Sequence, residues 1–447
     1  MTGKALLDRL NSQKAAELFS SLYGKDEVDA ARRRYAGLVE GFLSGAFPPG
    51  EFPEAAGELR VFSVPGRTEL GGNHTDHNRG KVLAGSIQLD AAAIAAPRKD
   101  KQVIFRSTGY SDVRVDISDL NPKESEKGKC AALIRGVAAE FAARGTPVGG
   151  FTANASNTVL KGSGLSSSAA VEVLFAKIFD NLYCGGGSGA IELARMGQKA
   201  ENVYFGKPCG LMDQAACASG GVVAIDFGDL SDPKVKGIPF DPAAAGFALC
   251  VVDTGGSHAD LTPDYAAIPA EMKAAAAFFG KTALRELDEN TLLAGLPDLR
   301  KAAGDRAALR ALHFFSENRR VDAMLAALEN MNARTDEKKG MDDFLALVRD
   351  SGDSSWELLQ NIYPPNNYRE QGMSLALALT RNFLAHDSAG MFRGACRVHG
   401  GGFAGTIQAY LPLERLEEYR ILVEGIFGKG ALTVLRIRSR GASELEF

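Results

Sequence analysis

Apolar residues recur with helical spacing in some parts of the chain and in short strand-like runs in others. Apolar positions at about 3.6-residue spacing predict helices over residues 1–45. β-Branched and aromatic runs then predict a first strand at 60–64, ended by Pro65-Gly66. Further strands are predicted at 81–89, 92–96, 102–107 and 151–154, and a helix at 130–144.

The same patterns continue toward the C-terminus. They predict helices from Ser166 and over 190–202, a strand at 221–226, a polar stretch at 228–236, a strand at 247–253, many helices between 265 and 390, a strand at 406–411 and a final helix from Leu413. Because the helices stand in blocks, the predicted class is α+β. The polar stretch predicts a boundary between an N-terminal lobe, 1–228, and a C-terminal lobe, 229–447.

Composition narrows the possible partners. The 447 residues include 51 Lys and Arg against 55 Asp and Glu, a balance that does not favour a nucleic acid or an anionic membrane surface. No signal peptide pattern opens the chain, and the most apolar run, 89–97, has about half the length of a bilayer-spanning helix. The six cysteines form no CxxC pair, so reduced thiols and a cytoplasmic location are expected.

A loop of small residues, Gly162 to Ala169, leads into the amphipathic helix predicted from Ser166. Unpaired N–H groups and the helix dipole at such a position attract a phosphate, and serine hydroxyls could add a metal ligand. A helix cap with spare serines is the alternative for this segment.

Two other nucleotide-binding motifs fail on their spacing or context. The Walker A candidate, Gly280-Lys281-Thr282, has Ala275 where the first glycine is needed. The run Gly400 to Gly405 fits GxGxxG, but a strand is predicted after it, and the dinucleotide fingerprint requires a helix.

A dense polar stretch follows the first predicted strand. Arg67 supplies a permanent fork of donors, and Asp76 can accept hydrogen bonds from two adjacent hydroxyls, as a sugar presents them. A metal bound by His74, Asp76 and His77 is the alternative, without an evident fourth ligand at suitable spacing.

Two carboxylates stand out further along. Asp213 is the one charge in the stretch from Pro208 to Ile225, and an acid in apolar surroundings is either functional or costly. Glu201 ends a predicted helix and could reach a divalent ion, but from the residues alone a solvated helix end is the favoured interpretation.

Together these stretches resemble the GHMP small-molecule kinases, and within them the galactokinases. Pro65 to Asp76 is similar to the galactokinase sugar-binding signature PGRxNxIGEHxDY, and Gly162 to Ala169 is similar to the phosphate loop GxGLSSSA. Gly210 to Gln214 matches GxMDQ, Val398 to Gly405 resembles the glycine loop that closes the active site, and Asp264-Tyr265 resembles part of the segment that opens the second lobe.

The resemblance implies the two-lobed GHMP kinase fold with the active site between the lobes, and transfer of the ATP γ-phosphate to the anomeric hydroxyl of galactose with Mg²⁺. It puts Asp213 and Arg67 in the catalytic positions. The implied sugar contacts are His74, Asp76, Asn73, Gly210 and Tyr265; the implied ATP contacts are Gly162, Ser163, Gly164, Leu165, Ser166, Ser167 and Ser168; the implied Mg²⁺ ligands are Ser168 and Glu201.

The signature departs from the family pattern at several positions. Glu69 stands where the family has Asn, and Asn73 where it has Glu; Gly71 replaces Ile and His77 replaces Tyr. The family Glu faces the C6 end of galactose, so its replacement makes a galacturonate-type sugar a second candidate substrate. A non-catalytic sugar sensor on the same fold is a third candidate, which the intact phosphate-loop and catalytic residues disfavour.

Overall fold

The structure, a computed structural model, describes residues 2–44, 58–146, 148–160, 162–256, 261–333, 337–365, 367, 369–385 and 393–447. The α-helices are α1 Gly3–Leu10, α2 Gln13–Tyr23, α3 Val28–Leu43, α4 Cys130–Ala143, α5 Ser167–Tyr183, α6 Ala190–Lys199, α7 Met212–Ser219, α8 Thr262–Phe278, α9 Glu289–Ala303, α10 Asp305–Asn332, α11 Glu337–Ser354, α12 Gly372–Ala385 and α13 Leu416–Phe427. The strands are β1 Arg60–Gly71, β2 Lys81–Pro97, β3 Gln102–Ser107, β4 Val113–Asp116, β5 Phe151–Asn157, β6 Val222–Asp226, β7 Lys234–Ile238, β8 Phe247–Asp253, β9 Ala395–Val398, β10 Thr406–Pro412, β11 Leu432–Leu435 and β12 Ser443–Glu444.

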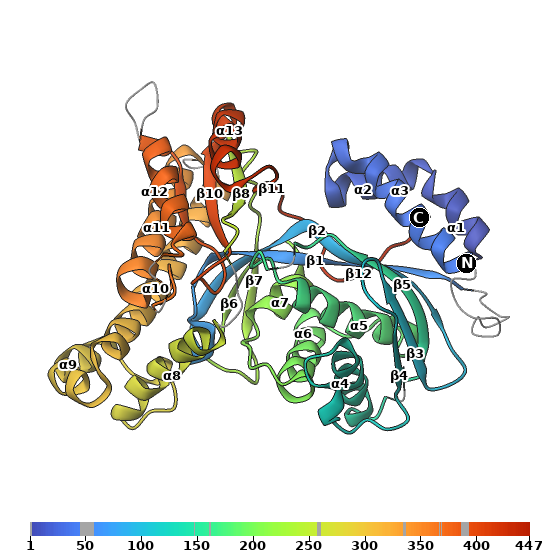
Figure 1. Ribbon diagram of the computed structural model, residues 1–447, viewed down its shortest axis with the longest axis horizontal. Coiled ribbons are helices and arrows are strands. Elements are labelled where there is room, and N and C mark those ends of the chain that lie inside the picture. The colour runs from blue at the N-terminus through green and yellow to red at the C-terminus, as the bar shows by residue number, and fades with distance from the viewer. Residues whose placement is uncertain are drawn as a thin grey trace.

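Two sheets organise the described part of the chain. The larger has the order β12-β1-β2-β5-β3-β4, with β6 beside β2 and β7 beside β6. Helices α1 to α3 cover one of its faces and α4 to α7 the other (Figure 1). The smaller sheet, β11-β8-β10-β9, lies among α10 to α13 (Figure 1). The predicted α+β class, with helices in blocks, is confirmed.

Strand β2 carries the most apolar run of the chain, and it is buried on both faces. Ala92, Ile94 and Ala96 belong to the core under α1 to α3, whereas Ala91, Ala93 and Ala95 belong to the core on the other face. Alternating side chains point to opposite faces of a sheet, so a strand covered on both sides reads as continuously apolar. The prediction of two strands here is wrong, because Asp90 interrupts the pattern without interrupting the strand.

Strand β1 also runs further than predicted. It continues through Pro65-Gly66 to Gly71, and its pairing with β2 shifts register between Pro65 and Arg67. A bulge of this kind accommodates a proline inside a strand and redirects the following side chain. Gly66 is required there, since a Cβ would lie 2.7 Å from the Leu165 carbonyl oxygen. The Arg67 N–H donates to that same oxygen at 3.1 Å, so the bulge docks β1 onto the phosphate loop.

The other predicted helices and strands are present near their predicted positions, and the structure adds helix α7 and strands β4, β7, β9, β11 and β12. A π-helix, Ala200–Phe205, extends α6, and β7 forms inside the predicted polar stretch. A strand follows Gly405, as the exclusion of the dinucleotide fingerprint required. Ala275 of the Walker A candidate lies in helix α8. Strands β7 and β12 come after residue 228 yet pair with β6 and β1 of the larger sheet, and the lobe boundary stays a prediction.

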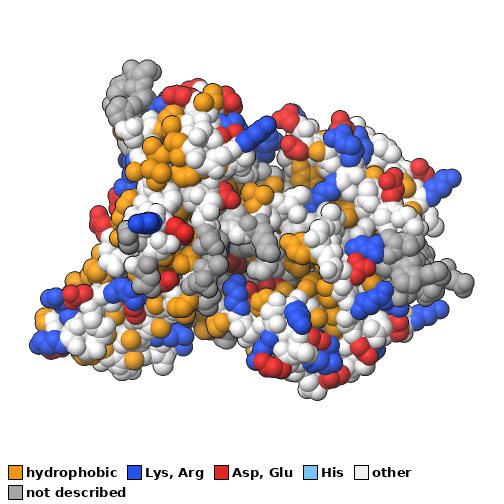
Figure 2. Space-filling model, in the orientation of Figure 1, with side chains coloured by type: hydrophobic (Ala, Val, Ile, Leu, Met, Phe, Trp, Pro, Cys, Tyr) orange, Lys and Arg blue, Asp and Glu red, His pale blue; other side chains and the backbone are white. Residues whose placement is uncertain are grey.

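The face of the molecule shown in Figure 2 carries side chains of both charges. Basic and acidic side chains are intermixed there. The surface is indented between the part that holds the smaller sheet and the part that holds the larger sheet. Among the described residues, no helix has the length and apolar character needed to cross a membrane.

A buried carboxylate ties three distant parts of the chain together. Asp90 is fully buried and accepts hydrogen bonds from Arg34 of α3 at 2.5 Å and from Arg438 near the C-terminus at 3.2 Å. Tyr23 of α2 donates to the same carboxylate at 2.7 Å. Burial raises the pKa of Asp90, but the two guanidinium groups and a hydrogen bond from the Ser63 hydroxyl hold that pKa below its usual value.

We therefore expect Asp90→Asn to lower the free energy of unfolding by about 3 kcal/mol or more, because it leaves two arginines near the core without a counter-charge. The matched control is Asp29→Asn, which removes one carboxylate from an exposed ion pair with Arg32 and should cost under about 0.5 kcal/mol. Urea denaturation of the two variants measures both effects. Equal losses would show that the buried cluster adds no special stability.

Candidate active site

The two residues expected to be catalytic are in direct contact. Arg67 Nε and Nη2 donate to Asp213 Oδ1 at 2.9 and 2.7 Å, although 146 positions separate them in the chain. Arg67 is 4% exposed, whereas the Asp213 side chain is 37% exposed. The buried cation thus holds a carboxylate whose other side faces the surface.

The phosphate loop, residues 162–168, is attached to this pair. Arg67 Nη1 donates to the Gly164 carbonyl, and Ser166 Oγ donates to Asp213 Oδ2 at 2.6 Å. Ser166 is the N-cap of α5 and has a left-handed conformation, with φ of 62°. Its hydroxyl binds the carboxylate and does not cap the helix, so this side chain leaves the first N–H groups of α5 to other acceptors.

The individual side chains of the phosphate loop have different roles. Ser163 is buried and its hydroxyl donates to the Leu160 carbonyl at 2.7 Å, while the Leu165 side chain lies in the core. Ser167 accepts a hydrogen bond from Asn157 at 2.8 Å. Ser168 is exposed on the first turn of α5. Gly162 and Gly164 have φ of 76° and 68°, which favour glycine, so the loop presents backbone more than side chains.

The electrostatics of Asp213 follow from these partners. Burial raises its pKa, but the adjacent Arg67 charge and the hydrogen bonds from Ser166 and Arg67 outweigh burial and hold the pKa below its usual value. Asp213 is therefore an ionised, weak base at neutral pH.

The sugar loop, residues 72–78, meets the glycine loop, residues 400–402. Three successive carbonyls of the glycine loop accept hydrogen bonds, from Asn73 Nδ2 at 2.8 Å, from His74 Nε2 at 3.0 Å and from Tyr265 Oη at 2.9 Å. The residues expected to contact the sugar from the two halves of the sequence thus converge on one short stretch of backbone.

His74 is held as a neutral imidazole. Burial lowers its pKa to about 3, with a smaller contribution from His77, whose ring stacks on it at 5.9 Å. A neutral ring that donates from Nε2 to a carbonyl carries its lone pair on Nδ1. His74 can then accept a hydrogen bond from a hydroxyl group.

Asp76 and Gly210 touch each other. A Cβ on Gly210 would lie 1.8 Å from Asp76 Oδ2, so no larger residue fits beside this carboxylate. The metal-site alternative for His74, Asp76 and His77 gains no support, since no group of three such side chains in the described part of the chain is arranged to hold an ion.

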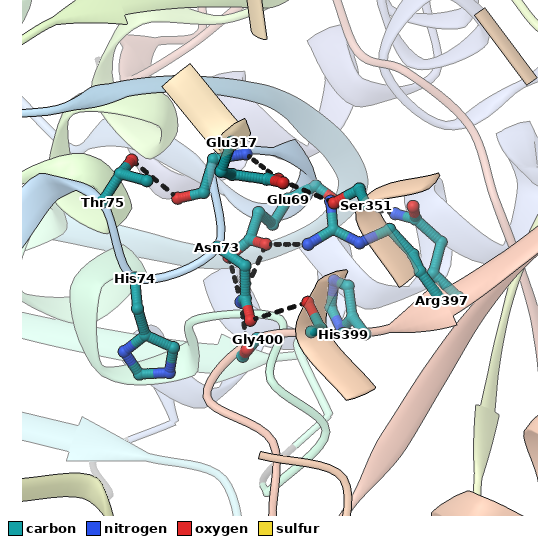
Figure 3. A network of polar contacts seen from close by, with 12 residues as sticks. Glu69, Asn73, His74, Thr75, Glu317, Ser351, Arg397, His399 and Gly400 are labelled. Atoms are coloured by element: carbon teal, nitrogen blue, oxygen red, sulfur yellow. Dashed lines mark hydrogen bonds and ion pairs between the residues drawn. The ribbon is translucent and has the colours of Figure 1, made fainter. Parts of the chain in front are cut away.

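Asn73 does not face an open space. It is fully buried; its amide donates to Glu69 Oε1 at 3.0 Å as well as to Gly400, and its Oδ1 accepts from Asn361 at 2.9 Å. Figure 3 shows Asn73 between Glu69 and Gly400, with the His74 ring lying apart from this cluster. Every polar atom of the Asn73 side chain is bonded within the protein, which does not support the expected direct contact with a sugar.

Glu201 is not a solvated helix end. It is buried in the π-helix, pairs with Lys207 at 3.0 Å and accepts from Gln214 Nε2 at 3.1 Å. The same Gln214 nitrogen donates to Glu172 of α5 at 2.9 Å, and the buried Glu172 Oε1 finds no hydrogen-bond partner in the part of the chain that the structure describes. Burial and the nearby Glu201 raise the pKa of Glu172 well above its usual value.

Several residues of the site escaped the sequence analysis. His399 is buried between two threonines: Thr68 Oγ1 lies 3.0 Å from its Nε2, and Thr406 Oγ1 lies 3.1 Å from its Nδ1. Thr406 Oγ1 also donates to the Ser163 carbonyl at 2.6 Å. Arg397 is fully buried and pairs with Glu69. A signal was available, since a charged residue inside the short apolar strand before the glycine run is costly unless it has a specific partner.

Comparison with known proteins agrees with this geometry. The profile "GHMP kinases N terminal domain" matches residues 132–221, and "Galactokinase galactose-binding signature" matches residues 50–97. A galactokinase of Streptomyces coelicolor is 36% identical over 281 residues, which cover 61% of this chain and 70% of the relative. A galactokinase of Streptomyces lividans is 35% identical over 277 residues, 60% of this chain and 66% of the relative. The chain belongs to the galactokinase family of GHMP kinases.

Solved structures show the same fold. Lactococcus lactis galactokinase complexed with galactose has a TM-score of 0.71 at 23% identity, covering 87% of this chain and 95% of that one. Methanococcus jannaschii mevalonate kinase has a TM-score of 0.57 at 14% identity, covering 86% of this chain and 99% of that one. The expected GHMP kinase architecture is confirmed.

His74 and His399 predict a pH response of the folded protein. Burial holds the pKa of His74 and of His399 at about 3 in the folded protein, whereas an unfolded imidazole titrates near pH 6.5. Below about pH 6.5 the unfolded chain binds protons that the folded chain does not, so these two residues lower the free energy of unfolding as pH falls from 6.5 toward 3. In ¹⁵N-histidine NMR spectra, both imidazoles should stay neutral between pH 8 and 5. A midpoint near 6.5 for either ring, assigned with His74→Asn and His399→Asn variants, would contradict this.

Proposed function

We propose that the protein is a galactokinase, which transfers the γ-phosphoryl group of ATP to the anomeric hydroxyl of galactose and gives galactose 1-phosphate. The observation that carries the proposal is the contact of Arg67 and Ser166 with the two oxygens of Asp213, beside the phosphate loop. A carboxylate held at the start of a glycine-serine loop can orient a hydroxyl toward a phosphate bound by backbone amides.

Asp213 would act mainly by orientation. Phosphoryl transfer has a loose transition state in which the attacking hydroxyl forms little bond to phosphorus, so its proton can leave late. A carboxylate with a lowered pKa suits that timing: it fixes the hydroxyl by a hydrogen bond and receives the proton as the new bond forms. Arg67 would keep Asp213 ionised and placed, and its charge would help to neutralise the transferring group.

The α5 N-terminus and the backbone of residues 162–168 would hold the ATP phosphates. The donors near them fit Mg²⁺, which prefers oxygen ligands: an exposed hydroxyl at Ser168, the carboxylate of Glu201, and the unpartnered Oε1 of Glu172. Ser168 and Glu201 are the proposed ligands. When bound, the ion would offset phosphate charge.

His74, Asp76, Gly210 and Tyr265 are the proposed sugar contacts. The neutral His74 would accept a hydrogen bond from a sugar hydroxyl at Nδ1, and Asp76, packed against Gly210, would accept hydrogen bonds from adjacent hydroxyls. The galacturonate alternative is not favoured, because Asn73 is buried and bonded within the protein and an acidic Glu69 lies 3.0 Å from it. The sensor alternative is not favoured, because the chain retains Arg67, Asp213 and the glycines and serines of residues 162–168.

Asp213→Asn should reduce kcat by at least about 100-fold, because an amide neither receives the proton nor pairs with Arg67. The affinity for ADP, measured by calorimetry, should stay within about twofold. Asp229→Asn, which removes an exposed carboxylate, is the control and should leave kcat unchanged. Wild-type turnover in Asp213→Asn would remove Asp213 from the mechanism.

A panel of sugars with Mg-ATP tests the substrate. Galactose should release ADP with a kcat/KM at least about 100-fold above galacturonate, since the buried Asn73 offers no partner to a C6 carboxylate and Glu69 would repel one. Higher activity on galacturonate, or none on any sugar, would contradict the proposed substrate.

A further inference from the structure

Glu69 and Asn73, the two departures from the sugar-binding signature, are neighbours in space. We propose that they form an exchanged carboxylate and amide pair that positions the sugar loop against the glycine loop through Arg397. The inference rests on the proposed function, since its readout is the binding and phosphorylation of a sugar.

The pair is a closed hydrogen-bonded unit. The Asn73 amide donates to both Glu69 carboxylate oxygens, at 3.0 and 3.3 Å, and to the Gly400 carbonyl at 2.8 Å. Glu69 is 2% exposed and Asn73 is fully buried. Neither side chain is free to turn toward a ligand without breaking a bond inside the protein.

Arg397 supplies the counter-charge. Its Nη2 donates to Glu69 Oε1, and it is fully buried in β9, the strand that leads into the glycine loop. Its Nε and Nη1 have no hydrogen-bond partner among the described residues, so the contact with Glu69 is the ion pair that supports this buried cation there. Figure 3 shows Arg397, Glu69, Asn73 and Gly400 as one continuous chain of contacts.

The pair therefore fixes the backbone that carries His74 against the glycine-loop backbone to which His74 is hydrogen-bonded. Asn73 precedes His74, and Gly400 precedes Gly401, whose carbonyl accepts from His74 Nε2 at 3.0 Å. On the other side, the Glu69 carbonyl accepts from Gln408 of β10 at 2.9 Å. A shift of the sugar loop or of the glycine loop would displace the His74 imidazole, which is expected to accept a hydrogen bond from a sugar hydroxyl.

The exchange explains why two substitutions coexist. The family pattern has Asn and Glu at the positions where this chain has Glu69 and Asn73, so the chain retains one amide and one carboxylate in reversed order. A single change would leave either two amides beside Arg397 or two carboxylates in contact. The hydrogen bond between the two side chains at 3.0 Å couples the two substitutions. The change at position 73 therefore does not by itself imply a different sugar specificity.

A reciprocal exchange tests the pair. The variants are Glu69→Asn, Asn73→Glu and the double variant, with Glu124→Asn as an exposed control. Each single variant should raise the KM for galactose at least about tenfold with ADP affinity within about twofold, because the sugar loop and not the phosphate loop is displaced. The double variant should recover at least about tenfold in kcat/KM over the weaker single variant.

Thermal melts accompany each assay, so that loss of folding is separated from loss of positioning. Should Glu69→Asn fail to fold, Glu69→Gln removes the charge at nearly constant volume and should also raise the KM for galactose. A double variant no better than the weaker single variant, or folded single variants with wild-type KM, would overturn the inference. If the wild type released ADP with another sugar and not with galactose, the proposed function would fall, and the same variants compared on that sugar would still decide the role of the pair.

Discussion

The contact between the Arg67 guanidinium and the Asp213 carboxylate fixes the geometry on which the rest of the site depends. Arg67 is buried at the bulge of β1, and its fork of donors is divided between Asp213 on α7 and the Gly164 carbonyl in the phosphate loop. A buried guanidinium cannot lose its proton and requires an anion nearby. The same charge that completes the core therefore aligns the candidate base with the loop expected to hold ATP.

The C-terminal half of the chain contributes to the site through polar groups that are buried where the chain folds against its N-terminal half. Thr406 donates to the Ser163 carbonyl, and Asn73 donates to the Gly400 carbonyl. These groups would be unsatisfied and costly if either loop moved away, so contacts of this kind keep the phosphate, sugar and glycine loops in register. The positions of the loops therefore depend on contacts between residues of both sheets, and no single sequence motif fixes them.

Sequence alone predicted the elements whose patterns are local. The helices of residues 1–45 and α5 after the glycine-serine loop followed from spacing, and the resemblance singled out Arg67 and Asp213, which the structure brings into contact. The errors lay where a distant partner overrode a local signal. Asp90 does not end β2, because Arg34 and Arg438 neutralise it, and Pro65-Gly66 does not end β1, because a bulge docks on Leu165. The resemblance alone predicted a sugar contact for Asn73, and its partners Glu69, Asn361 and Gly400 could not be placed from the sequence.

The proposed function requires that Asp213 accept a hydrogen bond from the anomeric hydroxyl of the sugar beside the γ-phosphate of ATP. A crystal structure of the protein with galactose and a non-hydrolysable ATP analogue would test this arrangement. We expect the anomeric oxygen within hydrogen-bond distance of an Asp213 carboxylate oxygen, and the terminal phosphate on the opposite side of that oxygen over residues 162–168. Galactose bound with its anomeric carbon away from Asp213, or with another hydroxyl against the carboxylate, would contradict it.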